Sequence, residues 1–434
     1  MPSAKRLQFA PLTPKAQSAV DPAHTTSPAV SAGSDKPLRV VLIAGEASGD
    51  YLGEGVLRAL TQLSSQQGQQ VQVAGIFGPL MQRAASADSF LPMADLAVNG
   101  LGAVLLNLPK LVGHLNATTA AILGAKPDVV LSIDAQDFAM RLGRRIRQAD
   151  PKRQIKLVHL VAPTVWAKRP ERAEQLAQYL DHLLCLYPFE PELFERHGLA
   201  STFVGHRGVG EFVLPTPGSF RTAQGLDEST PLLTLLPGSR RSEIKWLLPK
   251  FLTAFELMSQ QLPTLRAFMP VAAVVAEDVE AIIAPWRAQN SAMGNRLGCL
   301  HDPALKWQLF SDSDAALAAV GTVSMELALT KTAAVLAYDG GWLTRRYFRQ
   351  WNNYSSIPSI IAGREIQKEL RWDDSAPQNL AASILDLLKD KPKAKEVGES
   401  SHEAVMTLAR RDPNGQIQNA STLAAEVILK LAQG

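Results

Sequence analysis

One arrangement occurs twice in this sequence and constrains the fold more than any other feature. Residues 40–44 are a short apolar, β-branched run, residues 45–50 are a loop of mostly small residues, and residues 52–60 carry apolar side chains at helical spacing. The same order returns in residues 232–251. A strand, a short loop and a helix in this order begin a βα unit. Because such units bind ligands at the carboxyl end of the strand, near a helix N-terminus, both loops are candidate binding segments.

Further apolar runs of strand length follow in both halves of the chain, with helical patterns between them. They lie within residues 71–81, 127–138, 155–169, 183–190, 202–206, 267–276, 315–320 and 333–338. Strands that alternate with helices in this way build parallel sheets. We therefore predict an α/β fold with two Rossmann-like, doubly wound parallel-sheet domains that face each other across a cleft.

Pattern and composition divide the chain into five parts. Residues 1–36 are rich in Pro, Ser, Ala and Thr without periodicity, which is typical of a disordered tail. Residues 207–229 contain Gly, Pro and Ser in a weak pattern and are the predicted linker. The predicted domains are residues 37–206 and 230–375. Residues 376–434 are a helical C-terminal segment, a candidate to pack back on the N-terminal domain.

Charge and composition exclude several classes of function. A formal net charge of +3 over 434 residues is too small to indicate nucleic acid, but it suits an anionic small ligand or membrane surface. Cys185 and Cys299 lie far apart in apolar contexts, which favours two buried thiols over a disulfide. His159 is expected to serve structure rather than catalysis. No cluster of His and Cys indicates zinc, and Asp312 with Asp314 is weak evidence for a metal, so we predict no metal and no cofactor.

Residues 96–111 are unusually apolar for a connecting segment. No uncharged apolar run reaches the roughly 18 residues that a membrane-spanning helix needs. The segment, with Lys110 near its end, therefore has two interpretations: a buried helix, or a hydrophobic surface that touches lipid.

The first loop does not match either of the common nucleotide-binding motifs. Its glycines, and those that follow, do not have the spacing G-x-G-x-x-G of dinucleotide-binding folds: Gly45, Gly49, Gly53 and Gly55. Gly49 is followed by Asp50, whereas a P-loop ends in Gly-Lys-Ser/Thr. Hydride transfer and phosphoryl transfer by a P-loop are therefore disfavoured.

The second loop suits an anion better. Gly238, Ser239 and Arg240 stand with Arg241 directly before a helix, where backbone N–H groups, the helix dipole and a guanidinium can bind a diphosphate. The alternative is a solvated arginine pair at a helix start.

A third loop of small residues precedes another helix. Gly321 and Thr322 are followed by Glu326 in the first turns, and this carboxylate can accept hydrogen bonds from a ribose. The alternative is an acid that only interacts with the helix dipole.

A candidate general base follows a buried strand. Asp134 lies where residues 127–133 end, and a carboxylate there can deprotonate a hydroxyl nucleophile. Asp137, Glu46 and Asp50 compete for this role, and each of the four can instead cap a helix or hydrogen-bond a loop. Trp166 is either an aromatic lining of the cleft or a core residue.

Together these stretches resemble the lipid-A-disaccharide synthase family, inverting glycosyltransferases of the GT-B type. The matching segments keep the family's order: residues 44–50, 78–81, 102–111, 133–138, 163–167, 188–190, 203–206, 236–243, 321–326 and 361–365. They cover roughly residues 38–370, and it is the set, rather than any single segment, that is specific.

The resemblance implies a reaction and roles for the residues above. The donor would be UDP-2,3-diacylglucosamine, the acceptor 2,3-diacylglucosamine 1-phosphate (lipid X), and the products the β-1,6-linked disaccharide 1-phosphate and UDP. Asp134 would be the base, the loop around Arg240 would hold the diphosphate, and Glu326 the ribose. The family acts peripherally on the cytoplasmic face of the bacterial inner membrane, and a homodimer is left open. The expected acceptor-side residues are Glu46, Ser48, Asp50, Asp137 and Trp166.

The chain departs from the family's usual residues at several positions. Lys168 stands where the family has Trp, Arg207 where it has a proline or small residue, and Ser359 where it has Asn. Residues 369–372 are Glu-Leu-Arg-Trp where the family has Glu-Leu-Leu-Gln, so Trp372 replaces a Gln. Asp339 begins a segment that is usually Lys-rich in the family. Two alternatives therefore remain: a GT-B enzyme with another nucleotide sugar, and a non-catalytic, membrane-associated binding paralogue.

Overall fold

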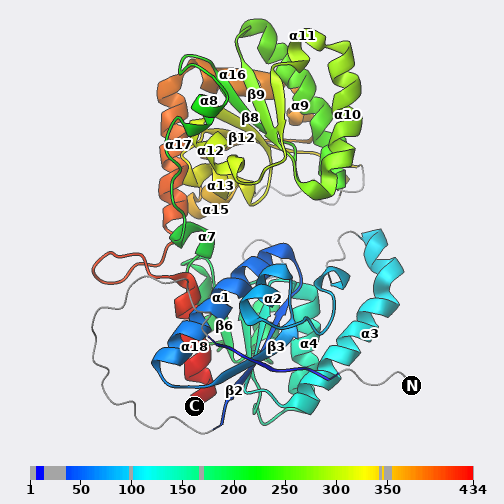
Figure 1. Ribbon diagram of the computed structural model, residues 1–434, viewed down its shortest axis with the longest axis vertical. Helices are drawn as coiled ribbons and strands as arrows, with labels where there is room; N and C mark the ends of the chain where they lie inside the picture. The colour runs from blue at the N-terminus through cyan, green and yellow to red at the C-terminus, as the bar shows by residue number, and fades with distance from the viewer. Residues whose placement is uncertain are drawn as a thin grey trace. The chain divides into compact units, whose positions relative to one another are not determined.

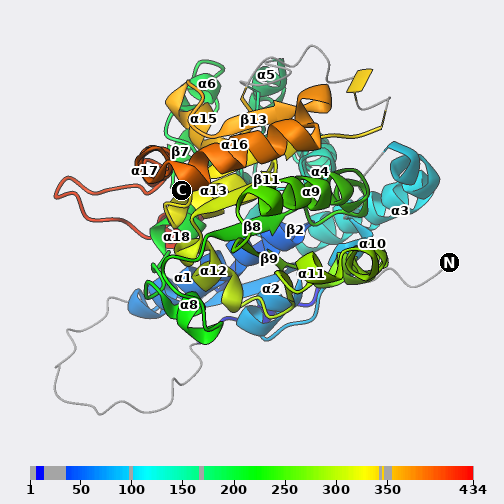
Figure 2. The same cartoon turned by 90° about the horizontal axis from the view of Figure 1, so that it is seen from above.

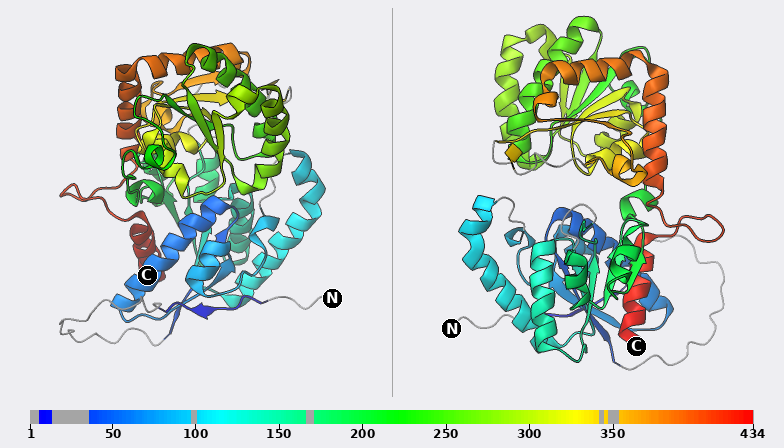
Figure 3. Two further views of the ribbon diagram at one scale, coloured as in Figure 1. Left: turned by 45° about the horizontal axis from the view of Figure 1, so that its top comes forward. Right: turned by 180° about the vertical axis from the view of Figure 1, so that it is seen from behind.

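The computed structural model describes residues 6–13, 36–96, 101–165, 171–341, 345–346 and 354–433, and of residues 101–108 and 292 it describes the backbone alone. The chain divides into two compact units. Unit 1 contains Met1–Glu211 and Leu408–Gly434, and unit 2 contains Phe212–Thr407. Figure 1 labels many of the elements of each unit, and Figure 3 shows the same chain from two further sides.

Unit 1 is built on a sheet with the strand order β1-β3-β2-β4-β5-β6-β7. Strands β2 to β7 pair in parallel, and β1 pairs antiparallel with β3. The strands are β1 (Ala10–Pro11), β2 (Leu38–Ala44), β3 (Val71–Ile76), β4 (Val129–Ile133), β5 (Lys156–Leu160), β6 (His182–Cys185) and β7 (Ser201–Phe203). The helices include α1 (Ala47–Gln66), α2 (Pro79–Ala85), α3 (Leu101–Ala125), α4 (Gln136–Ala149), α5 (Glu171–Ala177), α6 (Glu190–Glu195), α7 (Arg207–Gly210) and α18 (Ala420–Gln433).

Both faces of this sheet are covered, which explains why its strands are apolar without alternation. Successive side chains of a strand point to opposite faces. Val40 and Leu42 of β2 pack in one core with α1, α2 and α18, whereas Val41 and Ile43 pack in a second core with α3, α4 and α5. All four are almost fully buried, and burial of a side chain of this size stabilises the fold by about 1.5–3 kcal/mol.

Part of the predicted N-terminal tail is ordered against unit 1. Strand β1 continues the sheet, and the Leu12 amide donates to the Val71 carbonyl at 2.9 Å. Leu12 is buried, and the Arg39 guanidinium lies 4.5 Å from the centre of the Phe9 ring. These two apolar side chains give residues 6–13 a surface to bury, which the composition of residues 1–36 as a whole did not indicate. Residues 1–5 and 14–35 lie outside the described residues.

Unit 2 is built on a parallel sheet with the order β10-β9-β8-β11-β12-β13. Its strands are β8 (Leu232–Leu236), β9 (Arg266–Pro270), β10 (Leu297–Leu300), β11 (Ala315–Ala319), β12 (Ala334–Tyr338) and β13 (Lys368–Arg371). Its helices include α8 (Ser219–Ala223), α9 (Arg241–Gln261), α10 (Ala276–Gln289), α11 (Ser291–Gly294), α12 (Leu305–Asp312), α13 (Val323–Leu329), α15 (Ile357–Ala362), α16 (Pro377–Lys389) and α17 (Lys391–Met406). One core packs α9, α10 and α16 on the sheet, and a second packs α8, α12 and α13. Figure 2 shows α16 beside α9.

The unit boundaries differ from the predicted ones at two places. The predicted linker, residues 207–229, contains helices α7 and α8 and is divided between the units after Glu211. The predicted C-terminal segment is also divided: α16 and α17 belong to unit 2, and α18 packs on α1 in unit 1. The physical reason is that Ile428 and Leu429 of α18 complete a core in unit 1, whereas Leu380 and Ile384 of α16 complete one in unit 2.

Candidate functional site

The strand order locates a ligand-binding edge in each unit. In unit 1 the chain passes from β2 to β3 on one side and then returns to β4 on the other side of β2. In unit 2 it passes from β8 to β9 and β10, and then returns to β11 on the other side of β8. Open parallel sheets bind ligands outside the carboxyl ends of the strands at such a switch point. The relevant loops are therefore those after β2 and β4 in unit 1, and those after β8 and β11 in unit 2.

The switch point of unit 1 brings Ser48 and Asp134 together. Ser48, in the first turn of α1, donates from Oγ to Oδ2 of Asp134 at 2.9 Å. Asp134 follows β4 directly and is partly exposed. The two loops approach so closely that a Cβ on Gly45 would lie 2.3 Å from Cβ of Ala135, so this position requires glycine. A carboxylate that already accepts a hydroxyl hydrogen bond has the position and chemistry of a general base.

The backbone around Asp134 is strained. Asp134 (φ 53°), Ala135 (φ 45°) and Val161 (φ 81°) have left-handed conformations at the ends of the adjacent strands β4 and β5. Such conformations are unfavourable for residues other than glycine, above all for the β-branched Val161, and they concentrate at functional sites. The Asp134 amide is held by a hydrogen bond to the Leu160 carbonyl at 3.0 Å.

His159 is a buried residue of this site for which the sequence indicated a structural role. It pairs with Ser132 across β4 and β5, and its Nδ1 lies 2.7 Å from Ser132 Oγ. Only 2% of the residue is exposed. Burial lowers the pKa of His159 to about 4, and the nearby Asp134 carboxylate opposes this shift. The imidazole is therefore neutral at physiological pH and supports the loop that carries Asp134.

Two of the other expected acceptor-side residues, Asp50 and Asp137, have different partners. Asp50 is 3% exposed, and its carboxylate accepts from the amides of Leu80 and Met81, both at 2.9 Å, so it caps α2 from the side. Asp137 points outward, and 85% of its side chain is exposed beside Arg172 at 3.8 Å.

Of the two remaining residues, Glu46 and Trp166, the structure describes Glu46. Glu46 is the residue before α1, and its carbonyl accepts from the Asp50 amide at 2.9 Å. Trp166 and Lys168 lie outside the described residues. Ser48 is therefore the expected acceptor-side residue whose hydrogen bond to Asp134 is established.

The loop after β8 is shaped for an anionic oxygen. The amides of Ser239 and Arg240 both donate to Oε2 of Glu243, at 2.9 and 3.2 Å. Gly238 has φ 116°, and a Cβ there would lie 2.3 Å from the same oxygen. The Arg240 side chain is 66% exposed, with Nη1 3.6 Å from Glu243. The amides thus already converge on one carboxylate, and the exposed guanidinium is available to a diphosphate at the helix start.

The loop after β11 carries Glu326 beside a lysine that the sequence analysis did not identify. Gly321 accepts at its carbonyl from Ser324 Oγ at 2.8 Å, and Thr322 is the residue before α13. Glu326 Oε1 lies 2.8 Å from Nζ of Lys306, whose ammonium group is 4.6 Å from the centre of the Trp307 ring. Both charged side chains are about one quarter exposed. The pairing of Lys306 with Glu326 depends on α12 and α13 meeting, which sequence spacing does not reveal.

Several other features prove structural. The Asp312 carboxylate accepts from the amides of Gly218 and Phe220, at 2.6 and 2.8 Å, so it caps α8. Within the described ranges no three His, Cys, Asp or Glu side chains gather as a metal site would require. Among the helices of those ranges, none combines the length and apolar character needed to cross a membrane.

Two of the family departures are also explained by packing. Arg207 pairs with the buried Glu54 at 2.7 Å and with Glu211 at 2.9 Å, so its guanidinium ties α7 to α1 within unit 1. Ser359 is fully buried, and its Oγ accepts from the Ile366 amide at 3.1 Å.

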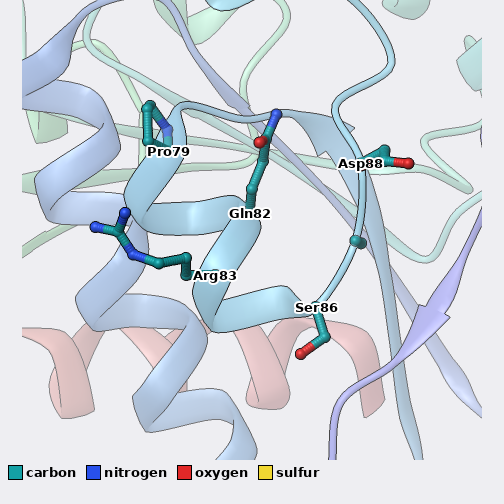
Figure 4. A pocket seen from close by; sticks show the side chains of 6 residues that line it. Pro79, Gln82, Arg83, Ser86 and Asp88 are labelled. Carbon is teal, nitrogen blue, oxygen red and sulfur yellow. The ribbon is translucent and has the colours of Figure 1, made fainter.

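A surface pocket of about 380 Å³ lies beside α2 in unit 1 (Figure 4). It is lined by Pro79, Gln82, Arg83, Ser86, Ala87 and Asp88. Figure 4 shows that Gln82 and Arg83 leave α2 in different directions and that Ser86 and Asp88 stand apart. None of the candidate site residues lines this pocket.

Solved structures define the class of protein to which this fold belongs. A UDP-GlcNAc 2-epimerase from Neisseria meningitidis, bound to UDP-GlcNAc, matches with a TM-score of 0.57 and 10% identity over 91% of this chain and 100% of that chain. The glycotransferase of kitacinnamycin matches with a TM-score of 0.55 and 14% identity over 92% of this chain and 100% of that chain. The fold is that of the GT-B glycosyltransferases, as predicted.

Sequence comparison identifies the family. The model of the lipid-A-disaccharide synthetase family matches residues 40–425. A lipid-A-disaccharide synthase from Rhodospirillum centenum is 40% identical over 401 residues, which are 91% of this chain and 95% of that protein. One from Burkholderia pseudomallei is 35% identical over 399 residues, 91% of this chain and 97% of that protein. The chain therefore belongs to the lipid-A-disaccharide synthase family, a family of glycosyltransferases that use a nucleotide-sugar donor and a lipid acceptor.

Proposed function

We propose that the protein transfers 2,3-diacylglucosamine from its UDP donor to 2,3-diacylglucosamine 1-phosphate, forming the β-1,6-linked disaccharide 1-phosphate and UDP. The observation that carries this proposal is the chemistry at the two switch points. Asp134 lies at the switch point of unit 1, and Arg240 and Glu326 lie in the loops and helices at the switch point of unit 2. We assign deprotonation of the acceptor hydroxyl to the first and binding of the nucleoside diphosphate to the other two. A transferase needs both functions, whereas a binding protein needs only the second.

The reaction follows from these roles as one displacement. Asp134 takes the proton of the acceptor hydroxyl while that oxygen attacks the anomeric carbon of the donor. The bond between the anomeric carbon and the diphosphate oxygen breaks, and both of its electrons leave with UDP. Arg240 stabilises the negative charge that develops on the diphosphate, and Glu326 accepts hydrogen bonds from the ribose. Attack from the face opposite the leaving group inverts the anomeric centre.

The acyl chains of both substrates lead us to propose peripheral binding to the cytoplasmic face of the inner membrane. The support lies in α3, whose apolar first half continues into the half-exposed Val112, with Lys110 paired to Asp95 at 2.6 Å next to it. An apolar helix flanked by a cation suits an anionic lipid surface. A homodimer stays a prediction, for which the mass of the native protein in detergent-free buffer is the measurement.

The native chain should be assayed with radiolabelled UDP-2,3-diacylglucosamine and lipid X, and the product separated by chromatography. We expect release of one UDP per disaccharide formed. Parallel reactions with UDP-N-acetylglucosamine test the alternative that another nucleotide sugar is the donor. Binding to anionic vesicles without turnover of either donor would favour the non-catalytic paralogue and reject the proposal.

A further inference from the structure

An exposed aromatic side chain lies one helical turn after Ser48 at the switch point of unit 1. Tyr51 belongs to α1, and 38% of the residue is exposed. Residues three apart on a helix are neighbours on its surface, with Cβ atoms about 5–6 Å apart, so Tyr51 lies beside Ser48. Helical side chains also lean toward the N-terminus of their helix, which brings the ring toward the first turn, where Ser48 donates to Asp134. The surface next to the candidate general base is therefore partly aromatic.

The ring of Tyr51 is supported by Arg207. The central carbon of the guanidinium lies 4.3 Å from the centre of the ring, within the range of a cation–π interaction. Nη1 donates to the Tyr51 carbonyl, Nη2 pairs with Glu54 at 2.7 Å, and Nε pairs with Glu211 at 2.9 Å. Only 12% of the Arg207 side chain is exposed. Because all three guanidinium nitrogens are engaged within unit 1, Arg207 holds the ring in place and is not available to a ligand.

Helix α1 has a glycine where the guanidinium approaches it. Gly55 lies one turn after Tyr51, and a Cβ there would lie 2.8 Å from Nε of Arg207 and 2.3 Å from Oγ of Ser421. A larger residue at position 55 would therefore displace the arginine. Arg207 itself stands where the family has a proline or small residue, neither of which carries a guanidinium. The support of this ring by a cation thus follows from one of the family departures.

The Tyr51 hydroxyl does not compete with Asp134 for the acceptor proton. Burial raises the pKa of Tyr51, and the positive charge of Arg207 opposes this rise. The phenol is therefore protonated at physiological pH and is not a base. What Tyr51 offers a ligand is the apolar face of its ring, and aromatic side chains are typical linings of small-molecule sites. A pyranose has a matching surface, because its C–H groups form an apolar face and its hydroxyls lie around the edge.

We infer that Tyr51 contacts the sugar ring of the acceptor as a specificity-determining residue, and that Arg207 is a positioning residue for Tyr51. A pyranose packed on the exposed ring lies beside Asp134, so its attacking hydroxyl is held within reach of the carboxylate. This inference rests on the proposed function, because it takes the acceptor to be a glucosamine derivative bound in unit 1.

The test varies lipid X at saturating UDP-2,3-diacylglucosamine and compares steady-state constants. Tyr51→Leu removes the ring but keeps an apolar side chain with good helix propensity. It should raise KM for lipid X about 5–10-fold and leave kcat and KM for the donor within twofold, because the lost contact is made equally in the ground and transition states. Tyr51→Phe retains the ring and should restore KM. Impaired folding would instead lower the melting temperature and affect both substrates.

An acceptor with acetyl groups in place of the long acyl chains distinguishes the sugar from the chains as the contact. If Tyr51 packs on the sugar, the ratio of kcat/KM between the native chain and Tyr51→Leu should be the same for this analogue as for lipid X. A ratio that falls to one with the analogue would show that the ring contacts the acyl chains, and the assignment to the sugar would be wrong.

The role of Arg207 is tested by combining two substitutions. Arg207→Lys keeps a positive charge near Glu54 and Glu211 but loses the planar guanidinium. It should raise KM for lipid X less than Tyr51→Leu does, and it should add nothing in the Tyr51→Leu background, because the two changes remove the same contact. An equal effect in both backgrounds would reject the positioning role.

The inference and the proposed function fail in different ways. An unchanged KM for lipid X in Tyr51→Leu, or a lower kcat at an unchanged KM, would overturn the inference while turnover by the native chain leaves the function intact. A native chain that does not turn over lipid X would overturn both.

Discussion

Units 1 and 2 share a strand order up to the switch point but place different chemistry there. In unit 1, Ser48 and Asp134 form an uncharged donor and a carboxylate that hydrogen-bond each other. In unit 2, Arg240 and Lys306 provide cations beside Glu243 and Glu326. The topology determines where a ligand binds, and the side chains determine which part of a reaction takes place there. This difference underlies the proposal that unit 1 moves the proton and unit 2 holds the diphosphate.

The two switch points also differ in which residues adopt left-handed backbone conformations. Unit 1 holds non-glycine residues in left-handed conformations at Asp134 and Ala135, each at a cost of about 1–3 kcal/mol, whereas unit 2 uses Gly238, which adopts its φ of 116° without that cost. Strain at Asp134 is compatible with a carboxylate held in one orientation for proton transfer. A phosphate loop needs close backbone approach instead, and glycine provides it.

The largest expected effect is that of Asp134→Asn on the rate of transfer. The amide keeps the size and the hydrogen bond from Ser48 but cannot accept a proton, so turnover should fall by about 10²–10⁴-fold. The affinity for UDP should be unchanged, since the proposed ligands of UDP all lie in unit 2. Asp137→Asn, at the exposed acid of α4, is the matched control and should keep native turnover. If Asp134→Asn and the native chain have comparable turnover, Asp134 is not the general base.

The next largest expected effect, on the affinity for UDP, tests whether the diphosphate binds to the Arg240 loop of unit 2. Arg240→Ala removes one charge-assisted hydrogen bond, worth about 1.5–3 kcal/mol, and should weaken UDP binding about 10–100-fold. Arg241→Ala is the control, because this neighbouring guanidinium lies 3.3 Å from Asp278 and is 77% exposed. Calorimetry with UDP measures both. If the two variants lose affinity equally, the loss reflects net charge, and the assignment to the Arg240 loop is wrong.

The sequence predicts the features of the two units that depend on local patterns, but not those that depend on contacts between distant residues. Strands and loops follow from local patterns, so both sheets and the loops at Gly238 and Gly321 were predicted correctly. The contacts of single acids were not, because they depend on partners that are distant in sequence. Asp50 lies in the expected loop, yet its carboxylate caps α2, and Glu326 is paired with Lys306 from another helix. Neither contact has a sequence signal, since both depend on how helices meet around the sheet.

A third effect concerns the pH dependence of unit 1. The pKa of His159 is lowered from 6.5 to about 4 by burial, so below pH 6.5 the unfolded state binds a proton that the folded state does not. Stability is therefore highest above pH 6.5 and falls as the pH approaches 4, by about 1.4 kcal/mol per pH unit, or tenfold in the unfolding equilibrium. Urea unfolding at pH 7 and pH 5 measures this. His159→Asn, whatever its stability at pH 7, should show a smaller difference between the two pH values, and an unchanged difference would contradict the assignment.

The smallest effect tests whether Lys306 belongs to the donor site of unit 2 or only to its surface. An ion pair that is one quarter exposed contributes about 0.2–1 kcal/mol, so Lys306→Met should raise KM for the donor by about 1.5–5-fold and leave kcat unchanged. Lys306→Arg should restore KM, because a guanidinium can also hold the Glu326 carboxylate. Lys393→Met, which breaks the exposed pair between Lys393 of α17 and Asp386 of α16 at 2.6 Å, is the matched control and should change neither constant. A rise in KM that Lys306→Arg does not reverse would show that the ammonium group itself, rather than its pairing with Glu326, contacts the donor.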